Sequence, residues 1–200
     1  MAGLCLMVSV ASAQPVTLLA LGDSLTAGYG LQPSDAFPVK LEAALRARGH
    51  DVKVVNAGVS GDTALDGASR LDWALSEQVD AAIVELGAND ALRGLPVAQA
   101  EQALDRILSA LAEKRVEVLL AGMRAPPNLG PEYQVQFDGM YARLAEKHGV
   151  LLYPFFLDGV AADPGLNQAD GMHPNPAGVD VIVARILPSV EDLLARVAAK

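Results

Sequence analysis

The chain has 200 residues, which is enough for one domain with a full hydrophobic core. Hydrophobic residues make up 52% of it and charged residues 20%, a composition that excludes a disordered protein. The formal net charge of −9 argues against nucleic-acid binding and against electrostatic docking on anionic membranes, so we expect no nucleic-acid partner.

The first 13 residues carry no charge and end in Ala11-Ser12-Ala13. This pattern is typical of the apolar region and small-residue cleavage site of a secretory signal, so we predict cleavage before Gln14 and a single domain over 14–200. No Lys or Arg precedes the apolar run, and the alternative is an apolar N-terminal strand or a cloning remnant. The stretch is too short to span a bilayer, and we expect no stable membrane anchor.

The only cysteine, Cys5, lies within this first segment. The rest of the chain then has no thiol, which excludes a disulfide scaffold, a thiolate metal site and a cysteine nucleophile. Leu4 precedes Cys5, where cleavage of a lipoprotein would need a small residue, so no lipid anchor is expected.

Strand-like and helix-like segments alternate five times along the remaining chain. The expected strands are short apolar runs at 16–21, 52–56, 81–86, 116–121 and 150–153. The expected helices span 35–48, 63–78, 96–114, 133–147 and 177–199; Asp35 is the expected N-cap of the first, and Pro188 can bend the last. Continuous apolar strands are typical of a parallel sheet covered on both faces. The pattern predicts an α/β fold, a three-layer α/β/α sandwich with a five-stranded parallel sheet.

Polar and glycine residues cluster where three of the expected strands end, at Gly22-Asp23-Ser24, 56–63 and 87–90. Because the carboxyl ends of parallel strands share one edge of the sheet, these segments should meet at one crevice. Each alone could be an ordinary turn. Ser24 would stand between a buried strand and a helix, its hydroxyl facing the crevice and unpaired N–H groups nearby to stabilise negative charge. The alternative is that Asp23 and Ser24 merely cap the helix.

One of the three histidines, His173, lies in an irregular stretch before the last helix, three residues after Asp170. A carboxylate bonded to one imidazole nitrogen fixes the tautomer and leaves the other nitrogen as a base. The alternatives are a helix cap or a pair of metal ligands, and no second histidine or carboxylate cluster has the spacing of a metal site. His50, in a helix-to-strand turn, and His148, at a helix C-terminus, fit structural roles.

Together these residues supply the parts of an acyl-transfer site. Ser24 is the candidate nucleophile, His173 the general base and then the general acid, and Asp170 the group that orients the imidazole. The candidate donors to the oxyanion of the tetrahedral intermediate are the Asn89 side-chain amide and the backbone N–H groups of Gly61 and Ser24.

With these blocks the chain resembles the GDSL, or SGNH, hydrolase family from about Val16 to its C-terminus. The resemblance is carried in order by Gly22-Asp23-Ser24-Leu25, Gly61, Gly87-Ala88-Asn89-Asp90 and Asp170-Gly171-Met172-His173. Alignment through 60–63 selects Gly61 rather than Gly58 for the second block. Within the family the chain is most similar to the bacterial periplasmic thioesterase/lysophospholipase/arylesterase subgroup, through 21–29, 59–63, 84–90 and 154–156; Ala88 stands where that subgroup often has Gly.

The resemblance implies a flavodoxin-like SGNH-hydrolase fold and a periplasmic or secreted bacterial enzyme. It also implies hydrolysis of esters and thioesters of fatty and aromatic acids, with no metal or organic cofactor. The expected partners are therefore small-molecule esters or thioesters with apolar acyl or aryl groups, possible lysophospholipid substrates included.

The expected substrate pocket is open, because no Gly-x-Ser-x-Gly motif surrounds Ser24 and no sharp nucleophile elbow is predicted. The apolar loop 123–131 and the segment 155–166 are suited to an acyl chain. Candidate substrate-binding residues in them are Arg124, Pro126, Leu129 and Phe155. The alternative is that both segments are plain connections over the core.

Two other functions remain open at this point. A carbohydrate O-acetylesterase could use the same catalytic blocks, but it would need a polar, groove-like pocket. A non-catalytic binding module on a flavodoxin-like sheet would leave Asn89, Asp170 and His173 without a shared role, and the chain lacks a phosphate-cradling Gly-rich signature.

Overall fold

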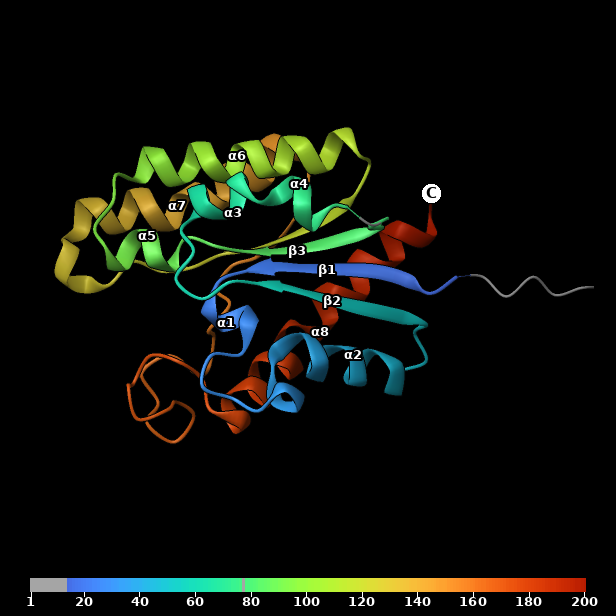
Figure 1. The fold of residues 1–200 in the computed structure, drawn as a ribbon. Coiled ribbons are helices and arrows are strands. Elements are labelled where there is room, and N and C mark those ends of the chain that lie inside the picture. Colours follow the sequence, from blue (N-terminus) through green and yellow to red (C-terminus); the bar gives the residue numbers. More distant parts are fainter. Residues whose placement is uncertain (1–13, 77) are drawn as a thin grey trace, which may run out of the picture.

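One parallel sheet organises the protein, with strand order β2-β1-β3-β4-β5. The computed structural model describes residues 14–76 and 78–200, so the predicted leader and Cys5 lie outside the described residues. The strands are β1 (Val16–Gly22), β2 (Val52–Gly58), β3 (Ala81–Glu85), β4 (Glu117–Ala121) and β5 (Leu151–Tyr153). Figure 1 shows helices on both sides of these strands, which confirms the predicted α/β fold with a five-stranded parallel sheet.

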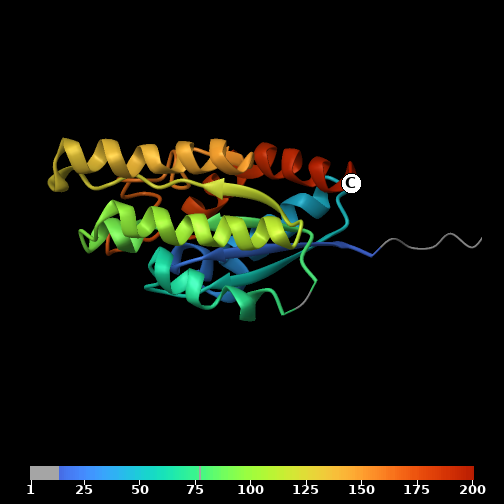
Figure 2. The same cartoon turned by 90° about the horizontal axis from the view of Figure 1, so that it is seen from above.

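Two groups of helices cover the two faces of the sheet. On one face α2 (Phe37–Ala47) packs against α8 (Pro176–Ala198), which continues through Pro188. On the other face lie α3 (Ala64–Ser69), α6 (Val97–Glu113) and α7 (Pro131–His148). Figure 2 shows α6 and α7 side by side along the sheet. The three-layer sandwich predicted from the alternating pattern is therefore confirmed.

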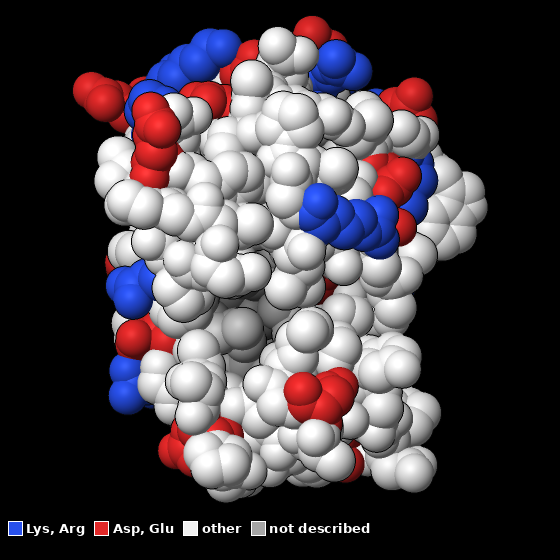
Figure 3. Space-filling model, turned by 90° about the vertical axis from the view of Figure 1, so that its left-hand side faces the viewer, with Lys and Arg blue, Asp and Glu red and all other residues white. Residues whose placement is uncertain are grey.

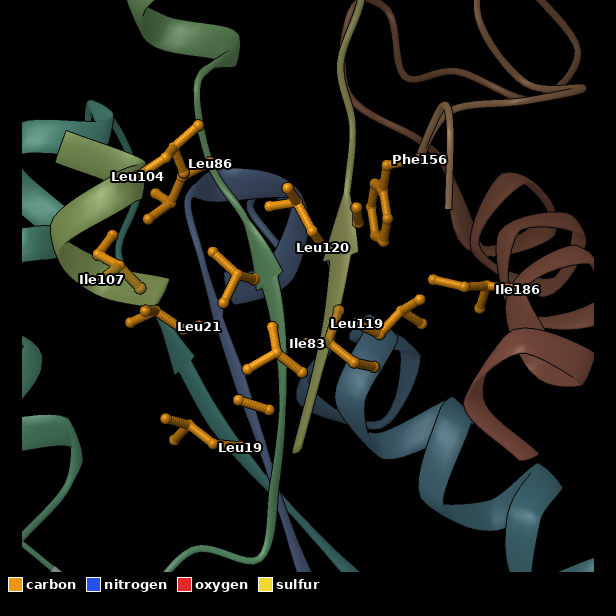
Figure 4. Packing of buried hydrophobic residues seen from close by; sticks show 14 of the residues in the cluster. Leu19, Leu21, Ile83, Leu86, Leu104, Ile107, Leu119, Leu120, Phe156 and Ile186 are labelled. Carbon is orange, nitrogen blue, oxygen red and sulfur yellow. The ribbon is translucent and has the colours of Figure 1, made fainter. Parts of the chain in front are cut away.

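The strands are apolar without alternation because both of their faces are buried. Residues 18–21 of β1 are each at most 1% exposed. Leu104 and Ile107 of α6 pack on one side of the sheet, whereas Ile186 of α8 and Phe156 pack on the other (Figure 4). This two-sided core holds the strand ends in fixed positions.

The prediction of Asp35 as the N-cap of the first long helix is wrong. Pro33 opens a separate 3₁₀ turn, Pro33–Asp35, whose first carbonyl accepts the N–H of Ala36. Ala36 then has extended backbone, and α2 begins only at Phe37. Asp35 instead forms an ion pair with Lys40, with 3.4 Å between Oδ1 and Nζ.

The single helix predicted over 63–78 is also wrong. It is two short helices, α3 and α4 (Leu71–Ala74), separated at Arg70, whose φ of −105° and ψ of 6° depart from helical values. Gly67 and Ser69 have low helix propensity, and the Ser69 hydroxyl donates to the Leu65 carbonyl. The break follows from these weak local preferences together with the contacts of the Arg70 side chain described below.

Two further short helices follow the ends of β1 and β3. The first, α1 (Ser24–Ala27), is the helix expected after the first strand, whereas α5 (Ala88–Leu92) was not predicted. They are too short to show a helical hydrophobic period. A 3₁₀ turn at Pro127–Leu129 interrupts the predicted loop, and α7 starts at Pro131, two residues earlier than expected. The short helices α1 and α5 orient the polar residues of the crevice.

Candidate active site

The carboxyl ends of the three central strands lie next to one another, as the sequence predicts. Gly22 of β1 is in register with Gly58 of β2 on one side and with Glu85 of β3 on the other. The segment between β5 and α8 lies at the same edge, below α1 in Figure 1. Three strand ends and one late loop therefore meet at one place.

Ser24 is the first residue of α1, and its helix is capped by Asp23. The Asp23 carboxylate accepts the N–H of Leu25 at 3.0 Å and is fully buried, while Ser24 is 9% exposed. Asp23 therefore caps the helix and at the same time places Ser24, because the capped turn holds the Ser24 side chain at the edge of the crevice.

His173 lies between Ser24 and Asp170. Its Nε2 is 3.0 Å from Ser24 Oγ, and its Nδ1 is 2.7 Å from Asp170 Oδ2. The other oxygen, Asp170 Oδ1, accepts the N–H groups of Met172 at 2.9 Å and of His173 at 3.0 Å. These two backbone donors and the imidazole lower the pKa of Asp170 to about 2. An ionised carboxylate only accepts, so Nδ1 carries the proton and Nε2 is left to accept one from Ser24.

The predicted oxyanion donors lie around the serine. Asn89, in the first turn of α5, donates from Nδ2 to Asp23 Oδ2 and to the Asp62 carbonyl, both at 3.0 Å. Among the described residues, the backbone N–H groups of Ser24 and Gly61 donate to no other protein atom. Gly61 has a φ of +89°, which favours glycine, and its carbonyl accepts a hydrogen bond from Arg93 at 2.7 Å. Two free N–H groups and one fixed amide thus surround the space beside Ser24.

A cavity of about 430 Å³ opens in front of Ser24. Figure 3 shows a hollow on this face of the molecule whose surroundings are mostly neither acidic nor basic. Its apolar lining comes from five separate segments of the chain and includes Leu25, Leu92, Met123, Pro126, Phe155, Leu157 and Met172. The site therefore combines a serine, an oriented imidazole and an apolar cavity, which is the composition suited to acyl transfer from an apolar substrate.

Comparison with known proteins agrees with this geometry. The GDSL-like Lipase/Acylhydrolase family matches residues 20–181. The chain belongs to this family. Esterase TesA of Pseudomonas aeruginosa is 40% identical over 192 residues, which cover 96% of this chain and 94% of that protein. A protein of Escherichia coli named thioesterase 1/protease 1/lysophospholipase L1 is 42% identical over 160 residues, 80% of this chain and 76% of its own length.

A solved structure supports the fold assignment. The crystal structure of AlinE4, an SGNH-hydrolase family esterase, is 47% identical to this chain, covers 92% of it and 99% of its own chain, and superposes with a TM-score of 0.77. The fold is therefore that of the SGNH hydrolases, as the resemblance implied.

Three of the four substrate-binding candidates of this GDSL-family chain line the cavity, namely Arg124, Pro126 and Phe155. The Arg124 guanidinium lies over the Phe155 ring, 4.7 Å from its centroid. Leu129 is not part of the lining, so the geometry does not support its assignment as a substrate-binding residue. It follows Pro126 in the 3₁₀ turn at 127–129, which carries it toward Gly94 instead.

Sequence reasoning missed several residues of the pocket. The Tyr29 ring packs against the His173 imidazole with 4.7 Å between ring centroids, and Leu92, Leu157 and Met172 complete the apolar wall. Tyr29 and Met172 lie inside blocks that carried the family resemblance, which was the available signal. Leu157 lies in the segment 155–166, which was expected to line the pocket, but it was not singled out there. Leu92 had no signal, because it reaches the pocket only through tertiary packing.

Buried carboxyl groups lie beneath the site. Burial raises the pKa of Asp23 to about 6, and it raises the pKa of Glu85 well above its usual range, with the neighbouring Asp23 as a further cause. Burial likewise raises the pKa of Asp90, whose Oδ2 accepts the N–H of Ala64 at 2.8 Å. These groups are inside the fold rather than in the cavity, Asp23 excepted, so they act on the site through the residues that they hold.

Arg70 ties the same region together from the break between α3 and α4. Its Nε donates to Asp62 at 2.6 Å, and one Nη donates to the Gly22 carbonyl at 2.9 Å. Because the Asp62 carbonyl accepts from Asn89, this guanidinium supports the segment that carries the predicted oxyanion donors.

No group of three or more His, Cys, Asp or Glu side chains among the described residues is arranged to hold a metal ion. None of the described helices has both the length and the apolar character needed to cross a bilayer.

Proposed function

We propose that this GDSL-family protein hydrolyses carboxylic esters and thioesters through an acyl-enzyme formed on Ser24. The observation that carries the proposal is the continuous line of contacts from Asp170 through His173 to Ser24, at 2.7 Å and 3.0 Å, at the mouth of an apolar cavity. The names of the relatives, esterase and thioesterase among them, support the same reaction class.

In the first half of the reaction, Ser24 Oγ attacks the acyl carbon while His173 Nε2 takes the hydroxyl proton. Asp170 stabilises the imidazolium that forms, because its carboxylate is ionised. The N–H groups of Ser24 and Gly61 donate to the oxyanion of the tetrahedral intermediate, and the Asn89 amide joins them by releasing one of its two hydrogen bonds, to Asp23 or to the Asp62 carbonyl. His173 then protonates the leaving oxygen or sulfur, and the alcohol or thiol departs.

In the second half, water replaces the leaving group. His173 removes a proton from the water as it attacks the acyl-enzyme, and a second tetrahedral intermediate forms on the same donors. The bond between the acyl carbon and Ser24 Oγ then breaks while His173 returns the proton to Oγ, which releases the carboxylic acid and restores the Ser24 hydroxyl. The substrate, water and the named side chains supply every atom that these reaction steps need.

The apolar lining of the cavity supports substrates with fatty acyl or aryl groups, and extends the proposal to lysophospholipids, which the name of the Escherichia coli relative includes. The cavity does not favour an acetylated carbohydrate, because Leu92, Met123, Phe155 and Leu157 offer a sugar no hydrogen-bonding groups. A panel of p-nitrophenyl esters of increasing chain length beside an acetylated sugar distinguishes the two, and a clear preference for the sugar would contradict the proposal.

We further propose that residues 1–13 are removed on export and that a single domain, 14–200, acts in the periplasm or outside the cell. The support is the uncharged segment that ends in Ala11-Ser12-Ala13. N-terminal sequencing of the protein expressed in a bacterial host should find Gln14 first in the periplasmic or secreted fraction. An intact N-terminus retained in the cytoplasm would contradict it.

The decisive test of the nucleophile is covalent labelling. We expect a fluorophosphonate to add once to the folded protein, at Ser24, by intact mass and peptide mapping. The Ser24→Ala variant should take up no label and lose ester hydrolysis by about 10⁴-fold or more. A folded protein that is not labelled would overturn the acyl-enzyme mechanism.

A further inference from the structure

The carboxyl group of Glu85 lies directly beneath the nucleophile turn and takes no part in the mechanism above. Glu85 is the last residue of β3, fully buried and in register with Gly22 of β1. Its Oε2 accepts the hydroxyl of Thr26 at 2.7 Å and lies 3.4 Å from the backbone N of Asp23. Its contacts therefore flank Ser24 on both sides in the chain.

Gly22 provides the space for this contact. A Cβ at Gly22 would lie 2.1 Å from Thr26 Oγ1 and 2.6 Å from Glu85 Oε2, closer than real Cβ atoms approach other atoms. Because Gly22 has no side chain, the carboxyl group of Glu85 in β3 can reach the hydroxyl of Thr26 in α1. Gly22, Thr26 and Glu85 form one structural unit, although 63 residues of sequence separate the first from the last.

The surroundings of Glu85 favour its uncharged form. The titratable groups that interact with it among the described residues are Asp23, before α1, and Tyr141 of α7, one acidic and one phenolic. The nearby cation, Arg70, hydrogen-bonds to Asp62 and to the Gly22 carbonyl instead. A buried carboxylate without a cation is strongly unfavourable, and burial raises the Glu85 pKa accordingly.

The two carboxyl oxygens indicate where the proton sits. Oε2 faces the Thr26 hydroxyl and the Asp23 N–H, so it acts as an acceptor. Oε1 is buried and has no hydrogen-bond partner among the described residues. When Glu85 is uncharged, Oε2 is the carbonyl-like oxygen that accepts and the proton is on Oε1, where the O–H has no acceptor among the described residues.

We propose that Glu85 is a positioning residue that acts as an uncharged acid, bracing the turn that carries Ser24 through the hydroxyl of Thr26. The inference rests on the proposed function, because it concerns the placement of the nucleophile. Thr26 follows Ser24 by two residues in the single turn of α1, so anchoring Thr26 fixes the rotation of that turn. The brace thereby maintains the 3.0 Å contact between Ser24 Oγ and His173 Nε2.

Three variants test the brace. In Glu85→Gln, the amide oxygen can replace Oε2 as acceptor, so kcat for a p-nitrophenyl ester should stay within about threefold of the wild-type value. Glu85→Leu and Thr26→Val each remove one partner while keeping a similar shape, and kcat should fall by about 10- to 100-fold, with KM changed less than about threefold because the cavity wall is untouched. Thr26→Ser, which keeps the hydroxyl, should restore most of kcat.

The pH dependence of kcat/KM shows whether Glu85 is charged. If Glu85 is uncharged, Glu85→Gln leaves the acid limb of kcat/KM where it is in the wild type. If Glu85 were ionised, the substitution would remove a negative charge near His173, make the imidazolium less favourable and move that limb to lower pH. A moved limb, or a Glu85→Gln loss as large as that of Glu85→Leu, would overturn the uncharged acid.

Unchanged kcat in Thr26→Val would overturn the brace itself, even if Glu85→Leu fails to fold. These results are distinct from a failure of the proposed function, which would show as wild-type protein that neither hydrolyses the ester nor takes up fluorophosphonate at Ser24. Circular dichroism and thermal melting of each variant confirm that folded proteins are compared.

Discussion

Two histidine–aspartate pairs in this protein are alike in local geometry and differ in what lies beyond them. His173 meets Asp170 at 2.7 Å, and His148, at the end of α7, meets Asp105 of α6 at the same distance. Both imidazole side chains are largely buried, 16% and 11% exposed, beside partly exposed carboxylates. Local pairing alone would not tell the two apart.

The two pairs differ in the imidazole nitrogen that does not contact the aspartate and in what surrounds that nitrogen. The free nitrogen of His173 faces the Ser24 hydroxyl across an apolar cavity. His148 uses Nε2 for Asp105 itself, and that carboxylate is shared with Lys147 at 2.6 Å. The pair of His173 and Asp170 leaves a base next to the Ser24 hydroxyl, whereas the pair of His148 and Asp105 joins α7 to α6. A carboxylate beside histidine thus indicates catalysis only where a nucleophile and a cavity meet the other side of the ring.

The largest expected effect distinguishes the two histidines directly. His173→Ala should lower kcat/KM by about 10⁴-fold, because no other group can take the Ser24 proton. His148→Ala, the matched control, should change kcat/KM less than about twofold and lower the unfolding free energy by about 1 kcal/mol or less. Ester hydrolysis and urea denaturation measure both, and comparable activity losses in the two variants would remove the distinction.

The next largest effect concerns the oxyanion donors, which lie near His173 and Ser24 and have no equivalent near His148. Asn89→Ala should lower kcat by about 10²- to 10³-fold, with KM nearly unchanged, because the hydrogen bond to the oxyanion forms mainly in the transition state. Steady-state kinetics with one aryl ester decide this. A rise in KM at constant kcat would instead place Asn89 in ground-state binding.

A smaller effect on kcat is expected when the carboxylate beside His173 is removed, and none when the carboxylate beside His148 is removed. Asp170→Ala should lower kcat by about 10- to 100-fold, less than the roughly 10⁴-fold found for a buried triad aspartate, because solvent screens an exposed charge. The side chain of Asp170 is 40% exposed. Asp105→Ala serves as the control, and its kinetics should match those of the wild type. Equal activity in both variants would show that Asp170 is not needed to orient His173.

The most gradual effect is the loss of activity in acid. Protonated His173 cannot accept the Ser24 proton, so kcat/KM should fall by about tenfold per pH unit on the acid side. Asp170, with its pKa lowered to about 2, stays ionised throughout this range, whereas Asp23, with its pKa raised to about 6, also gains a proton as the pH falls. A pH-rate profile that is flat down to pH 4 would contradict the role of His173.

Much of the architecture could be predicted because its causes are local or periodic in the chain. Apolar runs such as 16–21 predict strands buried on both faces, and the alternation with amphipathic helices predicts a parallel sheet. Once the sheet is parallel, the ends of β1, β2 and β3 must share an edge, so Ser24, Gly61 and Asn89 could be grouped without coordinates. The short spacing of Asp170 and His173 likewise allowed their pairing to be predicted.

The features that could not be predicted depend on contacts between distant segments. Arg70 ends α3 as it reaches Asp62 and the Gly22 carbonyl, and the 3₁₀ turn at 127–129 takes Leu129 away from the cavity. The low helix propensity of Gly67 and Ser69 contributes to the first outcome, but neither outcome follows from helix period or local propensity alone. Glu85 was placed in a buried strand and in the 84–90 stretch of the resemblance, but its contact with Thr26 could not be predicted, because the two residues are 59 positions apart in the chain.

The sequence by itself determined the strands, the shared edge and the identity of the reacting groups, since hydrophobic period and short-range motifs act over a few residues. The tertiary structure alone decided which apolar side chains line the cavity and which buried carboxyl group lies beneath the nucleophile. Those outcomes depend on the close packing of side chains from separate elements, where sub-ångström fit and the loss of solvent set the energies.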